Sequence, residues 1–344
     1  VGACSLREYV LFVSFFPYVS SGPIVNAQEM LPQYRQIGRQ RLDWEKFAGG
    51  LYLFALGLSK KVLLADTFGK AVDAGYGNVA GLSGTDAWLV MLFYTLQLYF
   101  DFSGYCDMGR GIAHMLGMEL PVNFDSPYKA SNIIEFWKRW HITLNRFLRK
   151  YVYIPLGGNR KGTARMYLNL FLVFLVSGIW HGAGWNFVLW GALHGMLYLV
   201  TRAWQRRQPW QANAIVHVLS VALTFLFLNV TWMLFRSADL SQAGEFLGRL
   251  IGGGFAAPAV RITEAFNLEE FWYVIKILHL DRLPGSELYL CFGFLAVALW
   301  LVFFVRNAGE REKSFEPNGK NMLVTAFLMI WCVVSLSGVS SFLY

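Results

Sequence analysis

The fold is decided by residues 166–186, MYLNLFLVFLVSGIWHGAGWN, an apolar run that ends in a histidine flanked by glycines. As a helix, the part up to His181 rises about 24 Å, less than the roughly 30 Å hydrocarbon core of a bilayer. Gly182 and Gly184 then break the helix, so His181 is expected below the outer surface, in a turn that packs against protein or lines a polar tunnel. An ionisable ring at that depth is costly, which makes His181 a candidate functional residue.

The composition of the chain is typical of an integral membrane protein. Of its 344 residues 56% are hydrophobic and 15% are charged, and the mean hydropathy is +0.40. A soluble domain of this size would lack the polar residues to cover its surface. The apolar runs are helical, so we predict an all-α polytopic protein with a single membrane domain over residues 1–344. The expected spans are Leu51–Leu64, Trp88–Phe102, Met166–Trp180, Phe187–Ala203, Ile215–Phe235, Leu288–Phe304 and Met322–Leu343.

The net charge of +8 is unevenly distributed and indicates an orientation. Basic residues crowd residues 138–165, 202–207 and 306–313, whereas residues 239–287 are slightly acidic. By the positive-inside rule the basic segments face the cytoplasm and the acidic one lies outside. Anionic lipid headgroups account for the positive charge, so the expected partner is the bilayer and not a nucleic acid.

Two segments depart from plain spans. Residues 12–24 carry Pro17 and a second proline within apolar sequence, which disfavours a continuous helix and favours a re-entrant or interfacial hairpin. Lys60 and Lys61 stand in the middle of the apolar run 53–64. We expect this run to lie at the cytoplasmic face, where the two lysine side chains snorkel to water.

The segment Ile134–Tyr153 is predicted to be one in-plane interfacial helix, capped by Ser131 or Asn132. Apolar residues recur in it at three- and four-residue spacing, opposite a cationic face. His141 lies on the apolar stripe, which makes it a second buried histidine. Two such rings can take separate roles in acyl transfer. A neutral imidazole removes a proton from an acceptor hydroxyl, and the other imidazole holds the substrate or stabilises developing charge.

Five further residues are weighed as supporting groups. His194 follows His181 by thirteen residues and is as readily structural as functional. Asn186 and Trp180 flank the His181 turn. Asp101 and Asp107 are carboxylates in apolar sequence, which either orient a histidine or pair with a lysine or arginine to hold the fold.

The four cysteines lack metal-ligand spacing, so no metal site is predicted.

Several motifs follow one another along the chain: FFP at 15–17 with GPI at 22–24, FDFSGYCDM at 100–108, NF at 123–124 with FWKRWHITL at 136–144, YIPLGGN at 153–159, and WHGAGWNF at 180–187. In these motifs the chain resembles the membrane-bound O-acyltransferase (MBOAT) family, in its bacterial alginate O-acetyltransferase-like branch. The resemblance implies a ring of transmembrane and re-entrant helices around a thinned core with a central tunnel. It also implies that His181 is the essential histidine and His141 the second active-site histidine. Family members carry further N-terminal helices and a few residues beyond Tyr344, so the chain is expected to be incomplete.

The function implied is O-acetylation of a polysaccharide outside a bacterial inner membrane. The donor is a cytoplasmic thioester, acetyl-CoA, used as a substrate with no bound cofactor, and a periplasmic SGNH esterase-like partner receives the acetyl group. Alginate, cellulose, another exopolysaccharide and peptidoglycan all remain open as acceptors. Tyr344 is either an acyl relay or an interfacial anchor. The alternatives are a transporter or lipid flippase that uses the histidines as proton relays, and a scaffold for a polysaccharide synthase.

Overall fold

The computed structural model describes residues 4–37, 41–207, 213–268, 276–277, 279 and 285–338. Over these ranges the chain is helical and contains no strand, which confirms the all-α prediction. The chain packs as two compact units, the first made of Val1–Thr67, Gln97–Asp125 and Phe304–Tyr344, the second of Phe68–Leu96 and Ser126–Phe303.

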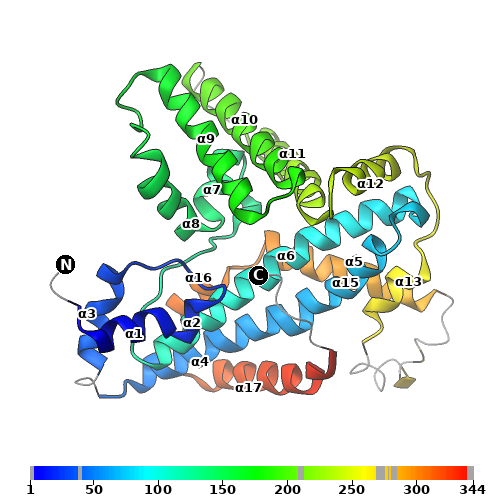
Figure 1. Cartoon of the computed structure of the whole chain (residues 1–344). Helices are drawn as coiled ribbons and strands as arrows, with labels where there is room; N and C mark the ends of the chain where they lie inside the picture. The colour runs from blue at the N-terminus through cyan, green and yellow to red at the C-terminus, as the bar shows by residue number, and fades with distance from the viewer. Residues whose placement is uncertain are drawn as a thin grey trace. The chain divides into compact units, whose positions relative to one another are not determined.

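Over the residues that the structure describes, each of the seven predicted spans is largely helical (Figure 1). Four helical stretches in the described part are long and apolar enough to cross a membrane: Trp44–Tyr76, Thr163–His181, Ala214–Arg236 and Ser286–Phe303. The last predicted span is occupied by α17 up to Val334 and then by the 3₁₀ turn η8, and residues 339–344 lie outside the described part.

The elements of the first unit are α1 (Leu6–Ser14), α2 (Phe16–Val19), α3 (Ala27–Ile37), α4 (Trp44–Ser59), η1 (Lys60–Ala65), the start of α5 (Asp66–Tyr76), the later part of α6 (Gly84–Met115), α16 (Ala308–Lys313), α17 (Gly319–Val334) and η8 (Ser335–Gly338). Those of the second unit are the rest of α5, η2 (Val79–Gly81), the earlier part of α6, η3 (Pro127–Lys129), α7 (Ile133–Arg139), α8 (Ile142–Leu148), η4 (Arg149–Tyr153), α9 (Thr163–His181), α10 (Trp185–Arg207), α11 (Ala214–Arg236), α12 (Leu240–Gly252), α13 (Val260–Thr263), η5 (Glu264–Phe266) and α15 (Ser286–Phe303).

In the first unit, α4 and α6 cross at two pairs of glycines. A Cβ on Gly57 would lie 2.6 Å from the carbonyl oxygen of Gly104, and one on Gly50 would lie 2.6 Å from that of Gly111. Only glycine allows the two backbones to come this close, as at other helix contacts in membranes. Nearer the N-terminus, α1 and α2 are separate helices that break at Phe15, so the predicted interruption of residues 12–24 is confirmed.

Because of the close crossing, Lys60 and Lys61 lie next to carboxylates of α6. From the sequence we had expected both side chains to snorkel to water. Lys60 Nζ lies 2.6 Å from Asp107 Oδ2, and Lys61 Nζ lies 2.8 Å from Asp101 Oδ1 and 2.9 Å from Asp66 Oδ1. Lys61 is only 3% exposed. The expectation of snorkelling is therefore wrong, because the carboxylates of α5 and α6 give each ammonium group an internal partner.

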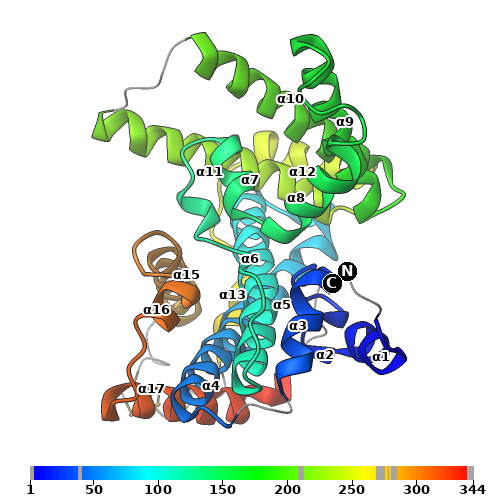
Figure 2. The same ribbon diagram turned by 90° about the vertical axis from the view of Figure 1, so that its left-hand side faces the viewer.

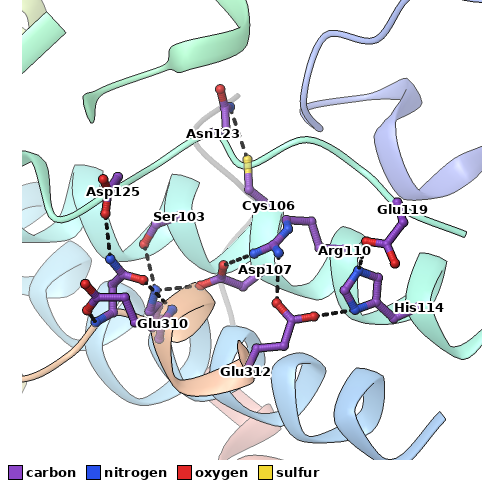
Figure 3. A network of polar contacts seen from close by, with 12 residues as sticks. Ser103, Cys106, Asp107, Arg110, His114, Glu119, Asn123, Asp125, Glu310 and Glu312 are labelled. Carbon is purple, nitrogen blue, oxygen red and sulfur yellow. Dashed lines mark hydrogen bonds and ion pairs between the residues drawn. The ribbon is translucent and has the colours of Figure 1, made fainter. Parts of the chain in front are cut away.

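The polar face of α6 continues as a chain of charges that reaches α16 (Figure 3). Arg110 Nη2 donates to Glu312 Oε2 at 2.8 Å, and His114 bridges Glu312 to Glu119, with 2.9 Å between His114 Nε2 and Glu119 Oε2. Glu119 in turn pairs with Lys46 of α4 at 2.6 Å. Both glutamates that bond to His114 come from segments that follow it in the chain.

Replacing His114 with glutamine is expected to lower the melting temperature at pH 6 by about 3 °C and to have less effect as the pH rises toward 10. Burial opposes the charged imidazole, but the bonds to Glu119 and Glu312 outweigh it and raise the pKa of His114. A raised pKa means that the stabilisation is complete below the ordinary value and is lost as the pH rises through the folded value. Melting curves of both proteins at several pH values test this, and a difference that is independent of pH would contradict it.

In the second unit, α9 and α10 form an antiparallel pair that is also joined through glycines (Figure 1). A Cβ on Gly191 of α10 would lie 2.5 Å from the carbonyl oxygen of Phe174, and one on Gly178 of α9 would collide with the carbonyl of Phe187. His181 lies about one turn beyond Gly178, and Trp190 precedes Gly191. The crossing therefore fixes the spacing of these two side chains.

The segment Ile134–Tyr153 is not one helix, as predicted, but α7, α8 and the π-helical turn η4. Asn132 caps α7 by accepting from the N–H of Glu135 at 3.0 Å, which confirms the predicted start. The break falls at His141, whose φ of 47° is in the left-handed region. Asn145 Nδ2 donates to the carbonyls of Trp137 at 2.5 Å and Trp140 at 2.9 Å, so its side chain replaces the helical hydrogen bonds there.

Candidate active site

His181 is the last residue of α9, as the sequence predicted. Gly182 caps the helix with an N–H to Ile179 O bond of 3.2 Å and an extended backbone, and the next helix begins at Trp185. A Cβ on Gly182 would collide with the ring of Phe187, so this sharp turn requires glycine. The short turn thus presents the imidazole at the end of a rigid helix.

Aromatic rings surround His181. Its ring centroid lies 4.8 Å from that of Trp180, 5.5 Å from Trp190 and 5.1 Å from Phe235, all at steep interplanar angles. Within the described residues the imidazole has no hydrogen-bond partner. A ring held by apolar edges and not tied by hydrogen bonds keeps both nitrogens available for a substrate.

His141 approaches the same place from the break between α7 and α8. Its ring lies 6.4 Å from that of Trp180, so one indole contacts both candidate histidines. Burial lowers the pKa of His141 to about 3, and the neighbouring His181 lowers it further. His141 is therefore neutral at physiological pH and able to accept a proton or donate a hydrogen bond.

His194, by contrast, is held by the protein at both ring nitrogens. Trp137 Nε1 donates to its Nδ1 at 3.3 Å, and its Nε2 lies 3.0 Å from Thr231 Oγ1. Since Nδ1 accepts, Nε2 carries the proton and donates to the threonine. His194 is fully buried, and its ring centroid lies 4.6 Å from that of Trp190. Its bonds tie α7, α10 and α11 together behind the aromatic rings.

The remaining candidates lie in different places. Asn186 Nδ2 donates to Ser237 O at 2.9 Å, which ties the start of α10 to the end of α11. Asp101 and Asp107 belong to the first unit, where they pair with the two lysines described above. Tyr344 lies outside the described residues.

Sequence reasoning missed the aromatic wall around the histidines. Trp190 and Trp232 stack with centroids 5.7 Å apart, and Phe235 lies 5.5 Å from Trp190 and 5.7 Å from Trp232. The residues come from α10 and α11, so only the fold brings them together. The available signal was the spacing of Trp232 and Phe235 by three residues, which places both on one helix face.

The described residues contain no group of three or more His, Cys, Asp or Glu side chains placed to hold a metal ion. What they provide is a pair of imidazoles in an apolar setting, at the end of a helix that is long enough to cross a membrane. Such an arrangement is suited to proton transfer from a hydroxyl group under conditions where water competes little.

Membrane-length helices and two neighbouring histidines, a buried one and a partly buried one at a helix end, define a multi-pass membrane protein with a histidine site. Residues 2–239 match the model of the MBOAT, membrane-bound O-acyltransferase family. The chain therefore belongs to this family, as its motifs indicated.

Three relatives illustrate the breadth of the similarity. The chain is 48% identical over 245 residues to a peptidoglycan O-acetyltransferase of Helicobacter pylori, covering 71% of this chain and 46% of the relative. It is 40% identical over 315 residues to a probable alginate O-acetylase of Pseudomonas fluorescens, covering 91% and 59%. It is 28% identical over 263 residues to a teichoic acid D-alanyltransferase of Bacillus subtilis, covering 67% and 61%. The chain thus spans about half the length of the first of these relatives.

Proposed function

We propose that the protein is the membrane component of a polysaccharide O-acetyltransferase in a bacterial inner membrane. The observation that carries the proposal is the placement of His181 and His141 against one indole, at a glycine-broken helix end, in a chain of the MBOAT family. Relatives named as O-acetyltransferases of peptidoglycan and alginate support acetyl as the group transferred.

In the proposed reaction His181 is the general base. It removes the proton of an acceptor hydroxyl as the hydroxyl oxygen attacks the carbonyl carbon of a thioester, and the thiolate leaves with that proton. His141, neutral and buried beside the same indole, positions the donor or stabilises charge at the carbonyl. The acceptor reaches the site from outside and the donor enters from the cytoplasm, both through the tunnel that the family resemblance implies.

Acetyl-CoA as the donor is supported by two arginines of α10. Arg202 Nη2 lies 3.7 Å and Arg206 Nη2 lies 3.9 Å from the sulfur atom of Met166, and neither has a carboxylate partner among the described residues. Like charges one turn apart on a helix repel each other, so the binding of an anion between the two guanidinium groups is favourable. The phosphates of a CoA thioester are such an anion, and residues 202–207 are on the side assigned to the cytoplasm.

Replacing Arg202 and Arg206 with glutamine is expected to raise KM for acetyl-CoA about tenfold per arginine, with little change in kcat. The reason is that each charge-assisted bond to phosphate contributes about 1.5 kcal/mol of binding. Initial rates of acetyl transfer as a function of acetyl-CoA concentration provide the measurement. Arg7→Gln, at an exposed arginine of α1, is the control and should leave KM unchanged. A fall in kcat at constant KM would argue against a donor site here.

We further propose that a periplasmic SGNH esterase-like partner receives the acetyl group and acylates the polymer. Peptidoglycan and alginate are the acceptors that the names of the relatives support. Membrane vesicles that contain the protein, with or without the partner, are incubated with [14C]acetyl-CoA, and the label is followed into polymer. Release of free CoA coupled to labelled polymer supports the proposal, whereas movement of a substrate across the membrane without thioester cleavage would support a transporter instead.

A further inference from the structure

Two buried indole groups of the aromatic wall, Trp190 and Trp232, have no hydrogen-bond partner among the described residues. Trp190 is 1% exposed and Trp232 is 2% exposed, and the Nε1 atoms of both lack an acceptor. Trp137, in the same aromatic wall, donates its N–H to His194. A buried donor without an acceptor is unfavourable and uncommon, so the two indoles call for an explanation that Trp137 does not need.

One of these two indoles contacts the proposed general base directly. The rings of His181 and Trp190 meet edge to face, with centroids 5.5 Å apart and an interplanar angle of 83°, and Trp232 stacks on Trp190 at 5.7 Å. Ser177 Oγ, one turn before His181 on α9, is also buried and without a partner. The helix that carries His181 and the two helices that carry the indoles therefore each contribute a buried polar atom without a partner among the described residues, which is the pattern of a site whose hydrogen-bond partner is a substrate.

We propose that the indole N–H of Trp190 is a catalytic hydrogen-bond donor to the carbonyl oxygen of the transferred acyl group. The assignment rests on the proposed function, since it needs His181 to act on an acceptor hydroxyl. Trp190 is chosen over Trp232 because it is the indole in direct ring contact with His181 on the α10 side.

The acceptor oxygen bonds to the carbonyl carbon, its proton passes to a ring nitrogen of His181, and the electron pair of the C=O bond moves to the carbonyl oxygen. The resulting oxyanion accepts the hydrogen bond from Trp190 Nε1. When the C=O bond re-forms, the C–S bond breaks and the thiolate leaves, taking the proton from His181. A donor fixed by packing before the reaction starts contributes about 10²- to 10³-fold to the rate of such a step.

The test replaces the N–H without changing the shape of the ring. β-(3-Benzothienyl)alanine at position 190 substitutes sulfur for the indole nitrogen. The expected result is a fall in kcat of about 10²- to 10³-fold with KM for acetyl-CoA changed less than twofold, and a melting temperature no lower than that of the natural protein. The same replacement at Trp204, an exposed indole further along α10, should leave kcat unchanged. Unchanged kcat at position 190 would overturn the proposal and leave Trp190 as a packing residue.

His181→Ala in the same assay separates this inference from the proposed function. If His181→Ala still transfers acetyl groups, the proposed function fails. If His181→Ala is inactive and the benzothienyl protein is fully active, only the role of Trp190 fails. Should the substituted protein not accumulate, [15N]tryptophan labelling of the natural protein offers a second measurement. Binding of acetonyl-dethio-CoA, a ketone without the cleavable C–S bond, should shift the indole resonance of Trp190 downfield, and an unmoved resonance would contradict the proposal.

Discussion

Replacing His181 with alanine is expected to reduce acetyl transfer by at least about 10³-fold while the protein stays folded. A general base contributes about 10² to 10⁴ to the rate, and His181 is the candidate whose ring nitrogens the described residues leave unbonded. The ring is only partly buried, and alanine is a good helix former, so the melting temperature should change little. Transfer of label from [14C]acetyl-CoA in purified membranes measures the loss.

The chain offers two comparisons for this experiment. His217→Ala, at an exposed histidine of α11, should keep full activity. His194→Ala should lower the melting temperature instead, because it removes the partner of both Trp137 and Thr231. If His181→Ala retained acetyl transfer while His141→Ala abolished it, the two histidines would have to exchange roles in the mechanism.

Replacing Lys61 with methionine is expected to lower the free energy of unfolding by about 3–5 kcal/mol, the largest stability effect we predict. The substitution removes the ammonium group between Asp66 and Asp101, leaving two buried carboxylates without it. The loss corresponds to a fall of about 10 °C in melting temperature, measured in detergent or nanodiscs. Lys70→Met, at an exposed lysine of α5, should leave the melting temperature unchanged.

Neutralising the carboxylates distinguishes a structural from a functional role of Asp101. The triple variant with Lys61→Met, Asp66→Asn and Asp101→Asn removes the ammonium group and both carboxylate charges together, so most of the lost stability should return. A triple variant that melts normally and transfers acetyl groups would make Asp101 purely structural. A triple variant that melts normally and is inactive would restore Asp101 as a site residue. A single Lys61→Met variant that is as stable as the natural protein would refute the ion-pair argument.

Much of the fold was predictable from the sequence because its determinants are local. Apolar runs of membrane length predicted the helices, and the glycines after His181 predicted where α9 ends. The helix cap at Asn132 was predictable for the same reason, since a cap depends on residues within one turn. The family followed from short motifs whose residue types and order are specific, and the match to residues 2–239 confirms it.

What could not be predicted depends on contacts between distant segments. The left-handed break at His141 is held by the side chain of Asn145, which overrides the amphipathic pattern of a continuous helix. The internal pairing of Lys61 requires α6 to approach α4 through glycines, and hydropathy alone does not reveal such a crossing. The aromatic wall beside His181 is assembled from residues more than forty positions apart in the sequence, Trp190 on α10 and Trp232 on α11.

The glycine crossing of α9 and α10 has a mechanical consequence. At Gly178 and Gly191 main-chain atoms touch directly, so there is no side chain that could compress or change rotamer to alter the spacing of the two helices. The hairpin can slide or rotate at this point, but it cannot widen without losing its contact. The distance between His181 at the end of α9 and Trp190 on α10 is therefore set by main-chain contact and does not depend on the packing of side chains.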